Sequence, residues 1–416
     1  MAIADQTEQQ TDTTPSGQAP PSQSEAAQAL VAAAKHLLTQ SPPSAITGRQ
    51  LASEARVNYG LVHRHFGSKT AVFKQALNEF IDDYVQDAYD PTDLLTPLRV
   101  LAHMEGWRAF VQVLLDRGSL SDYHPHSVGT IRYLKGLRRT RSNLDPNQIQ
   151  PVVALGLVME LGVPFQSLFI TPDTLNVDLA LVHDLTQTWH QGLQQGFGPL
   201  GREHYRPLIS DDPTPAHPPK PPRKHRGRAS VEERLVEAGT QLMTRQAPSG
   251  ISGRQLAATA GVNYGLIHHY FGSKDEVLRQ SIQLHHDLLA ESVATDGAQT
   301  GVPGLSVLRQ HPAYLRALVH AWVVDGTQPQ SGEISVRRDL AQRWIRPDQT
   351  PEDQAATAAA LVVALATQLA WAVFEPVLTQ AFQSDSQLLE PVVGAMLLAL
   401  ISEPLGGLPA ANPPPG

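Results

Sequence analysis

The chain has 416 residues, of which 41% are hydrophobic, and at roughly 100–200 residues per domain this length predicts two to four domains. It contains no cysteine, which excludes disulfide scaffolds, cysteine nucleophiles and cysteine-ligated metal centres. The formal net charge of −8 argues against a protein that coats nucleic acid through bulk charge, but it is compatible with a small basic face.

The two ends of the chain and its apolar runs indicate where the protein resides. Residues 1–23 are polar and hold no apolar signal segment, so we expect a disordered tail there and another at 406–416. The longest apolar runs, Pro151–Ile170 and Ala355–Leu378, are interrupted by polar and acidic residues and predict buried helices instead of membrane spans. We therefore expect a cytoplasmic protein with no membrane segment.

An internal repeat determines the predicted organisation. The run Ile46–Lys69 returns without a gap as Ile251–Lys274, 205 residues later. Upstream of both runs, apolar residues recur at the three- and four-residue spacing of an amphipathic helix. They are Leu30, Val31, Ala34, Leu37 and Leu38, with counterparts Leu235, Val236, Gly239, Leu242 and Met243. Downstream, Trp107–Leu115 matches Tyr314–Val323, and Pro151–Phe169 matches Ala356–Val377, so the whole chain is interpreted as a duplicated unit.

Each copy contains the local signals of a helix-turn-helix. In the second copy Ser252, Asn263 and Ser273 are candidate N-caps, and Gly261 supplies a left-handed corner between two short helices. The first copy has Thr47, Asn58 and Ser68 at the capping positions, but Arg56 at the corner.

The predicted fold is all-α, with two fused units packed as an intrachain pseudo-dimer. Each unit has a three-helix helix-turn-helix domain and then a helical-bundle regulatory domain. We expect the helix-turn-helix domains at 24–70 and 230–275, the regulatory domains at 71–206 and 276–405, and a proline-rich basic linker at 207–229.

The run Gly-Val-Asn-Tyr-Gly-Leu-Ile-His-His-Tyr-Phe-Gly-Ser-Lys at 261–274 resembles the signature of the TetR family of bacterial transcriptional regulators. The resemblance covers roughly 24–80 and 229–285. It implies a regulator of double-stranded DNA that responds to a small-molecule effector, with two units in one chain where usual members dimerise. His63 and His268 stand where the family often has Tyr, and Arg56 replaces the usual corner glycine.

Candidate DNA-contacting residues follow from position. The start of a recognition helix reaches base edges, and the flanking cations hold phosphates. The candidates are Asn58, Tyr59 and Gly60 with Asn263, Tyr264 and Gly265 for bases, and Thr47, Arg49, His63, Lys69, Ser252, Arg254, His268 and Lys274 around them. Arg226 and Arg228 belong to a basic run that either follows the minor groove as an arm or is a solvated linker. Alternatively, the asparagines are only helix caps and the cations only solvated charges.

Candidate effector-pocket residues lie in the apolar helices that follow. They are Trp107, Phe110, Glu160 and Phe165 in the first copy and Tyr314, Trp322, Gln368 and Trp371 in the second. Aromatic residues at helical spacing are also typical of plain core. Because Glu160 has the neutral Gln368 as its nearest counterpart, two identical pockets are not expected. His124–His126 and His285–His286 fit loop or surface histidines better than metal ligands, so no metal or cofactor is expected.

The leading hypothesis is a ligand-responsive repressor that recognises the two halves of a pseudo-palindromic operator. One chain would suffice, although further homodimerisation is compatible with the sequence. The alternative is a protein-interaction regulator whose helix-turn-helix motifs no longer contact DNA. An enzyme is not expected, since neither a nucleophile elbow, a phosphate loop nor a carboxylate pair is present.

Overall fold

The computed structural model describes residues 23–87, 97–116, 146–170, 175–194, 230–243, 248–296, 311–325 and 344–382. Over these ranges the chain forms helices and no strand, which confirms the all-α prediction. The predicted linker and C-terminal tail, the N-terminal tail up to residue 22, and Arg226, Arg228 and His124–His126 lie outside the described residues.

The first unit begins with three helices. They are α1 (Gln23–Gln40), α2 (Gly48–Glu54) and α3 (Gly60–Phe66), and α4 (Lys69–Asp87) leads away from them. The body of this unit follows as η1 (Pro97–His103), α5 (Met104–Leu115), α8 (Pro146–Gly162), η2 (Val163–Leu168) and α9 (Leu179–Gln194).

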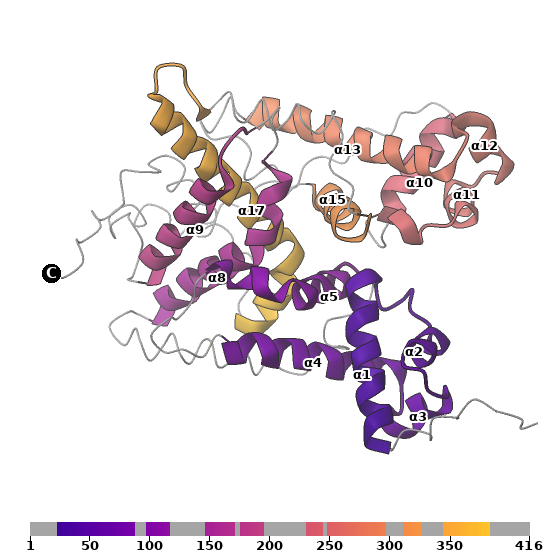
Figure 1. Cartoon of the computed structure of the whole chain (residues 1–416). Helices are drawn as coiled ribbons and strands as arrows, with labels where there is room; N and C mark the ends of the chain where they lie inside the picture. The colour runs from indigo at the N-terminus through magenta and orange to yellow at the C-terminus, as the bar shows by residue number, and fades with distance from the viewer. Residues whose placement is uncertain are drawn as a thin grey trace, which may run out of the picture.

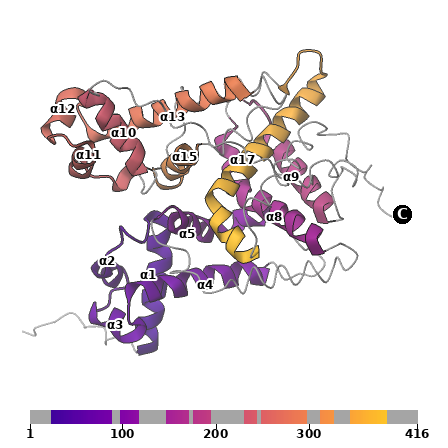
Figure 2. The ribbon, with the colours of Figure 1, turned by 180° about the vertical axis from the view of Figure 1, so that it is seen from behind.

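The second unit begins with the same arrangement of helices. Its three-helix domain is α10 (Val231–Met243), α11 (Gly253–Ala260) and α12 (Gly265–Phe271), with η4 (Pro248–Gly250) between the first two helices. The long helix α13 (Lys274–Asp296) leads to α15 (Pro312–Asp325) and α17 (Pro351–Phe382). In Figure 1 both three-helix domains lie on one side of the molecule and α8, α9 and α17 toward the other, and the view from behind in Figure 2 shows the same separation.

The bodies of the two units pack directly on each other through α8 and α17, which the repeat pairs as counterparts. A side chain at Gly162 of α8 would place its Cβ 2.9 Å from the carbonyl oxygen of Ala366 of α17, so glycine permits this close approach. The window Pro351–Glu375 of α17 is long and apolar enough to cross a membrane, but 94% of it is buried inside the fold. This agrees with the predicted buried helix.

The two three-helix domains are attached differently to this body. The core of the first domain, around Leu30 and Phe73, belongs to one continuous hydrophobic cluster that also contains Trp107 and Leu365. The core of the second domain, around Leu235 and Ile267, forms a separate cluster.

Candidate DNA-binding interface

The predicted N-caps of the short helices are confirmed. The Thr47 hydroxyl accepts a hydrogen bond from the Gln50 backbone N–H (3.1 Å), while the Gln50 side chain accepts one from the Thr47 backbone N–H (2.8 Å). Ser252 accepts from the Gln255 N–H in the same way (3.2 Å). Such caps satisfy backbone donors that have no partner within the helix, so each helix starts at a defined residue.

The corner between the two short helices has the same geometry in both units. Arg56 adopts φ 54° and Gly261 adopts φ 63°, both in the left-handed region. The following residue then bonds back across the corner, from Val57 N–H to the Ala52 carbonyl (2.9 Å) and from Val262 N–H to the Ala257 carbonyl (3.0 Å). This pairing is that of a Schellman motif. Arg56 therefore preserves the corner, at the conformational cost of a side chain with positive φ.

The two asparagines cap the recognition helices α3 and α12. The Asn58 side-chain oxygen accepts from the Gly60 N–H, and that of Asn263 from the Gly265 N–H, both at 2.9 Å. Both residues are exposed, so their amide nitrogens stay available to a ligand while their oxygens hold the helix start. The capping role is thus established, and base contact by the asparagines stays a prediction.

In each motif a tyrosine packs on a glycine of the preceding helix and is hydrogen-bonded to a histidine, which in turn contacts the carbonyl of a second glycine. The Tyr264 ring lies so close to Gly253 of α11 that a Cβ there would be 2.6 Å from it, and Tyr59 lies as closely on Gly48 of α2. The Tyr264 hydroxyl and His268 Nε2 are 3.2 Å apart, and His268 Nδ1 lies 2.9 Å from the Gly272 carbonyl.

The corresponding distances for Tyr59, His63 and Gly67 are 3.1 and 3.0 Å. Because a carbonyl only accepts, Nδ1 carries a proton, and in the neutral form of the imidazole the tyrosine hydroxyl donates to Nε2. Each tyrosine is 44% exposed, so its hydroxyl oxygen remains open to a donor or a phosphate-bound water.

The two lysines have a structural role that the sequence did not indicate. Lys69 Nζ donates to the carbonyls of Pro43 (2.9 Å) and Ile46, and Lys274 Nζ donates to the carbonyl of Ile251 (2.9 Å). Burial lowers the pKa of Lys69, and the charge of Asp116 opposes this shift. The ammonium groups thus fix the loop that precedes α2 or α11, and phosphate contact by them stays a prediction.

The remaining DNA candidates lie on the surface of the motif. Arg49 and Arg254 are exposed in the first turn of α2 and α11. In the second unit four of the candidates come together along a cleft of about 450 Å³, namely Ser252, Tyr264, His268 and Lys274, whereas Arg254, Asn263 and Gly265 do not line it. Arg64 and His269, which sequence reasoning did not single out, are also exposed on the recognition helices.

Comparison with known families agrees with this geometry. The family model of bacterial regulatory proteins, tetR family, matches the chain twice, at residues 30–76 and 235–280. The chain carries two DNA-binding domains of the TetR family. Each match starts within α1 or α10 and ends within α4 or α13, so it contains most of the first helix and both short helices of the motif.

Three mycobacterial regulators are similar to part of the chain. They include the HTH-type transcriptional repressor Rv3405c of Mycobacterium tuberculosis and the HTH-type transcriptional regulator Mb3439c of Mycobacterium bovis. Each is 27% identical over 159 residues, which cover 38% of this chain and 81% of the relative. Such a relative is about half as long as this chain, in keeping with two TetR-like units in one polypeptide.

Most of the predicted effector residues lie in the core that the two units share. Trp107 stacks edge-on against Phe165 (4.8 Å between ring centroids) and against Trp322 of the second unit (5.8 Å). Tyr314 and Trp371 are buried, and Phe110 is half-buried. Because these aromatic rings pack against one another, they are better explained as core residues than as the lining of a pocket. Binding of an effector to them stays a prediction.

Glu160 is the exception among these candidates. It is 1% exposed, accepts a hydrogen bond from the Tyr84 hydroxyl with Oε1, and has no partner for Oε2. Burial raises its pKa to about 8. Its counterpart Gln368 is also buried, with Oε1 unpartnered, so the two units carry different polar groups at this place.

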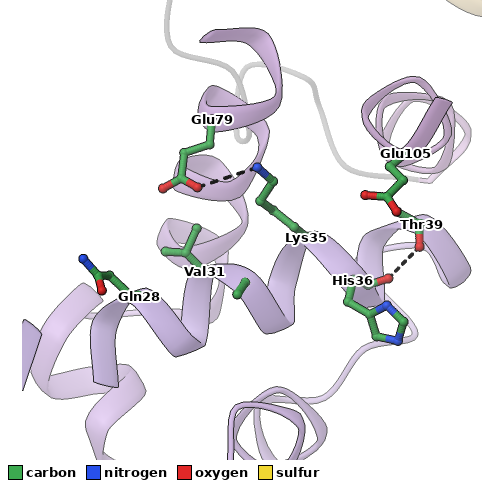
Figure 3. Close-up of a pocket in the computed structure, with 8 residues that line it drawn as sticks. Gln28, Val31, Lys35, His36, Thr39, Glu79 and Glu105 are labelled. Atoms are coloured by element: carbon green, nitrogen blue, oxygen red, sulfur yellow. Dashed lines mark hydrogen bonds and ion pairs between the residues drawn. The ribbon is translucent and has the colours of Figure 1, made fainter. Parts of the chain in front are cut away.

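A further pocket lies on the first TetR-family domain, away from the recognition helix. It measures about 400 Å³ and is lined by Gln28, Val31, Ala32, Lys35, His36, Thr39, Glu79 and Glu105. Figure 3 shows Lys35 of α1 reaching across to Glu79 of α4. Lys35 also pairs with Asp83 (3.0 Å), so the cation of this pocket is already neutralised. Over the described residues, no group of three or more metal-ligating side chains comes together.

Proposed function

We propose that the chain is a transcriptional repressor that recognises a pseudo-palindromic DNA operator as a covalent pseudo-dimer. The observation that carries the proposal is the placement of both TetR-family domains on one side of a body in which counterpart helices α8 and α17 pack together. A symmetric operator needs two recognition helices about one DNA turn apart, roughly 34–36 Å, or a multiple of this. One relative is named a transcriptional repressor, which supports repression instead of activation.

The proposal further includes a small-molecule effector that binds in the shared core. Buried polar atoms nearly always have a hydrogen-bond partner in native proteins. Glu160 Oε2, Gln368 Oε1 and both amide atoms of Gln112 have none within the described part of the chain. A cationic ligand with hydrogen-bond donors would ionise Glu160 and donate to its Oε2, and its site would be next to Tyr84 of α4, the helix that carries the first DNA-binding domain. We place this regulation in the cytoplasm.

The first experiment is selection of bound sequences from a random duplex pool. The mass of the complex between the protein and the selected site is then measured. We expect a two-part site bound by one chain, with affinity that falls steeply as salt rises. Tyr59→Ala and Tyr264→Ala should each weaken protection of a different half. The matched variants Tyr59→Phe and Tyr264→Phe keep the ring packed on its glycine and remove only the hydroxyl, so they separate packing from DNA contact.

Two outcomes would contradict the proposal. If no sequence is enriched even at low salt, the protein-interaction hypothesis replaces it. If two chains bind one two-part site, the fused units do not act as a pseudo-dimer. For the effector, Glu160→Gln should abolish the stabilisation by any screened compound that releases the operator. Retention of that stabilisation would place the effector elsewhere.

A further inference from the structure

The outward faces of the two recognition helices differ at one position. Val62 and Ile267 form the buried side of α3 and α12, so the helical periodicity puts residues 60, 63 and 64, and their counterparts 265, 268 and 269, on the opposite side. Gly60 and His63 recur as Gly265 and His268, whereas Arg64 is replaced by His269. Both differing residues are exposed.

The differing residue, Arg64 or His269, is four positions after the glycine at the start of its helix. A helical side chain leans toward the N-terminus and covers the residue four positions earlier. Arg64 therefore leans over Gly60, which has no side chain to obstruct it, and His269 leans over Gly265. The beginning of a recognition helix is the part that approaches base edges in a helix-turn-helix complex.

The other polar side chains on this surface already make hydrogen bonds within the protein. His63 is hydrogen-bonded to Tyr59 and to the Gly67 carbonyl, and the Asn58 oxygen caps Gly60. Arg64, by contrast, has no hydrogen bond or ion pair within the described residues. It can extend to a ligand without breaking an internal contact.

Arginine and histidine differ in what they recognise. The guanidinium fork donates two parallel hydrogen bonds to O6 and N7 of guanine in the major groove. A neutral imidazole has one donor and one acceptor and cannot make that pair of bonds.

We infer that Arg64 and His269 give the two half-sites different base preferences, with a guanine opposite Arg64 in the half bound by α3 and no such requirement in the half bound by α12. The inference rests on the proposed function, because it requires that both helices contact DNA. The operator is then symmetric where the two motifs share residues and asymmetric at this base pair.

Exchange of the two residues tests the inference. Selection from a random duplex pool is repeated with Arg64→His and with His269→Arg in the full chain. Arg64→His should remove the guanine preference from one half, and His269→Arg should create it in the other. The expected discrimination against other base pairs is roughly 5- to 150-fold, the range for one bidentate contact. The exchange of the neighbouring pair, His65→Tyr and Tyr270→His, is the matched control and should leave this base pair unchanged.

The possible failures are distinguishable. Absence of any enriched sequence with the unaltered chain overturns the proposed function itself. An enriched two-part site whose base preferences do not respond to either exchange overturns this inference alone. A uniform loss of affinity in Arg64→His, with a salt slope lower by about one, would make Arg64 a phosphate contact and would also overturn it.

Discussion

Ser281 of α13 fills the space that a side chain at Gly239 of α10 would need. A Cβ on Gly239 would lie 3.2 Å from Ser281 Cβ and closer still to the hydroxyl oxygen. That hydroxyl has the carbonyls of Val236 and Val277 within reach, each at 2.8 Å. In the first unit the counterparts are Ala34 and Ala76, both fully buried. The same helix pair thus packs in two ways, as alanine on alanine or as serine on glycine.

This relationship predicts strong coupling between the two positions. Gly239→Ala alone should lower the free energy of unfolding by about 1–3 kcal/mol, because the new methyl overlaps the Ser281 hydroxyl. Ser281→Ala alone should cost about 1 kcal/mol through the lost hydrogen bond. The double variant recreates the pair of the first unit and should be more stable than the sum of the single effects. Urea unfolding of the four proteins measures the coupling, and simple additivity would contradict it.

The left-handed corner predicts opposite effects of matched substitutions in the two units. Arg56→Gly should raise the free energy of unfolding by up to about 1 kcal/mol, because glycine accepts positive φ without the Cβ contact that arginine has there. Gly261→Arg should lower it by about 1–2 kcal/mol for the same reason. Arg56→Ala serves as the control, since it removes the side chain but keeps the Cβ. Thermal unfolding of the three variants measures these changes, and a gain with Arg56→Ala equal to that of Arg56→Gly would refute the backbone explanation.

The sequence predicted those features that depend on neighbouring residues. The caps at Thr47 and Ser252 and the corner at Gly261 are fixed within a few residues, and each appears where it was expected. The contacts of Lys69 and the packing of Tyr59 on Gly48 depend on segments that are brought together only by folding. They could not be derived from local patterns, although the recurrence of both glycines in the repeat was a signal.

The aromatic candidates for the effector pocket also show what local sequence patterns cannot predict, here for residues far apart in the chain. Trp107 and Trp322 were interpreted as linings of two separate pockets, because the repeat places them in different units. In the structure they contact each other. Only the packing of one unit on the other brings them together, and no periodicity in either copy indicates that packing.

The junction between α13 and α15 predicts that the second DNA-binding domain is sensitive to acid. His285 stands where the first unit has the buried Phe80, and neither of its ring nitrogens has a partner in the described structure. Burial, and to a smaller extent the charge of His311, lowers the pKa of His285; burial also lowers that of His311. His286, which contacts Asp287, and Tyr314 lie at the same junction.

A histidine whose folded pKa lies below its unfolded pKa stabilises the fold above the unfolded value, and this contribution is lost as pH falls through the folded value. These histidines should therefore contribute a fall in the free energy of unfolding between pH 7 and pH 5. His285→Phe, which restores the residue of the first unit, should reduce that fall. Urea unfolding at both pH values measures the difference, and Phe80→His is the reciprocal variant, expected to increase acid sensitivity. Equal pH dependence in the unaltered chain and His285→Phe would contradict the assignment.

Glu160 should change the free energy of unfolding with pH in the opposite direction to His285. Its folded pKa of about 8 lies above the usual value of 4.5, because burial disfavours the charged carboxylate. Its protonated form therefore stabilises the fold fully below pH 4.5, and this contribution is lost as pH rises toward 8. Between pH 4.5 and pH 7 the loss is on the order of 3 kcal/mol, at about 1.4 kcal/mol per unit of pH.

Glu160→Gln keeps the shape and removes the titration, so its unfolding free energy should depend less on pH over this interval than that of the unaltered chain. Gln368→Glu provides the reciprocal variant, because it adds a carboxyl at the buried counterpart and should steepen the dependence. Each variant is compared with the unaltered chain in urea at pH 5 and pH 7.5, so that titrations common to all three proteins cancel. If Glu160→Gln retains the full pH dependence, the carboxylate reaches solvent or a cation when it ionises, and the effector site proposed beside Tyr84 loses its charged anchor.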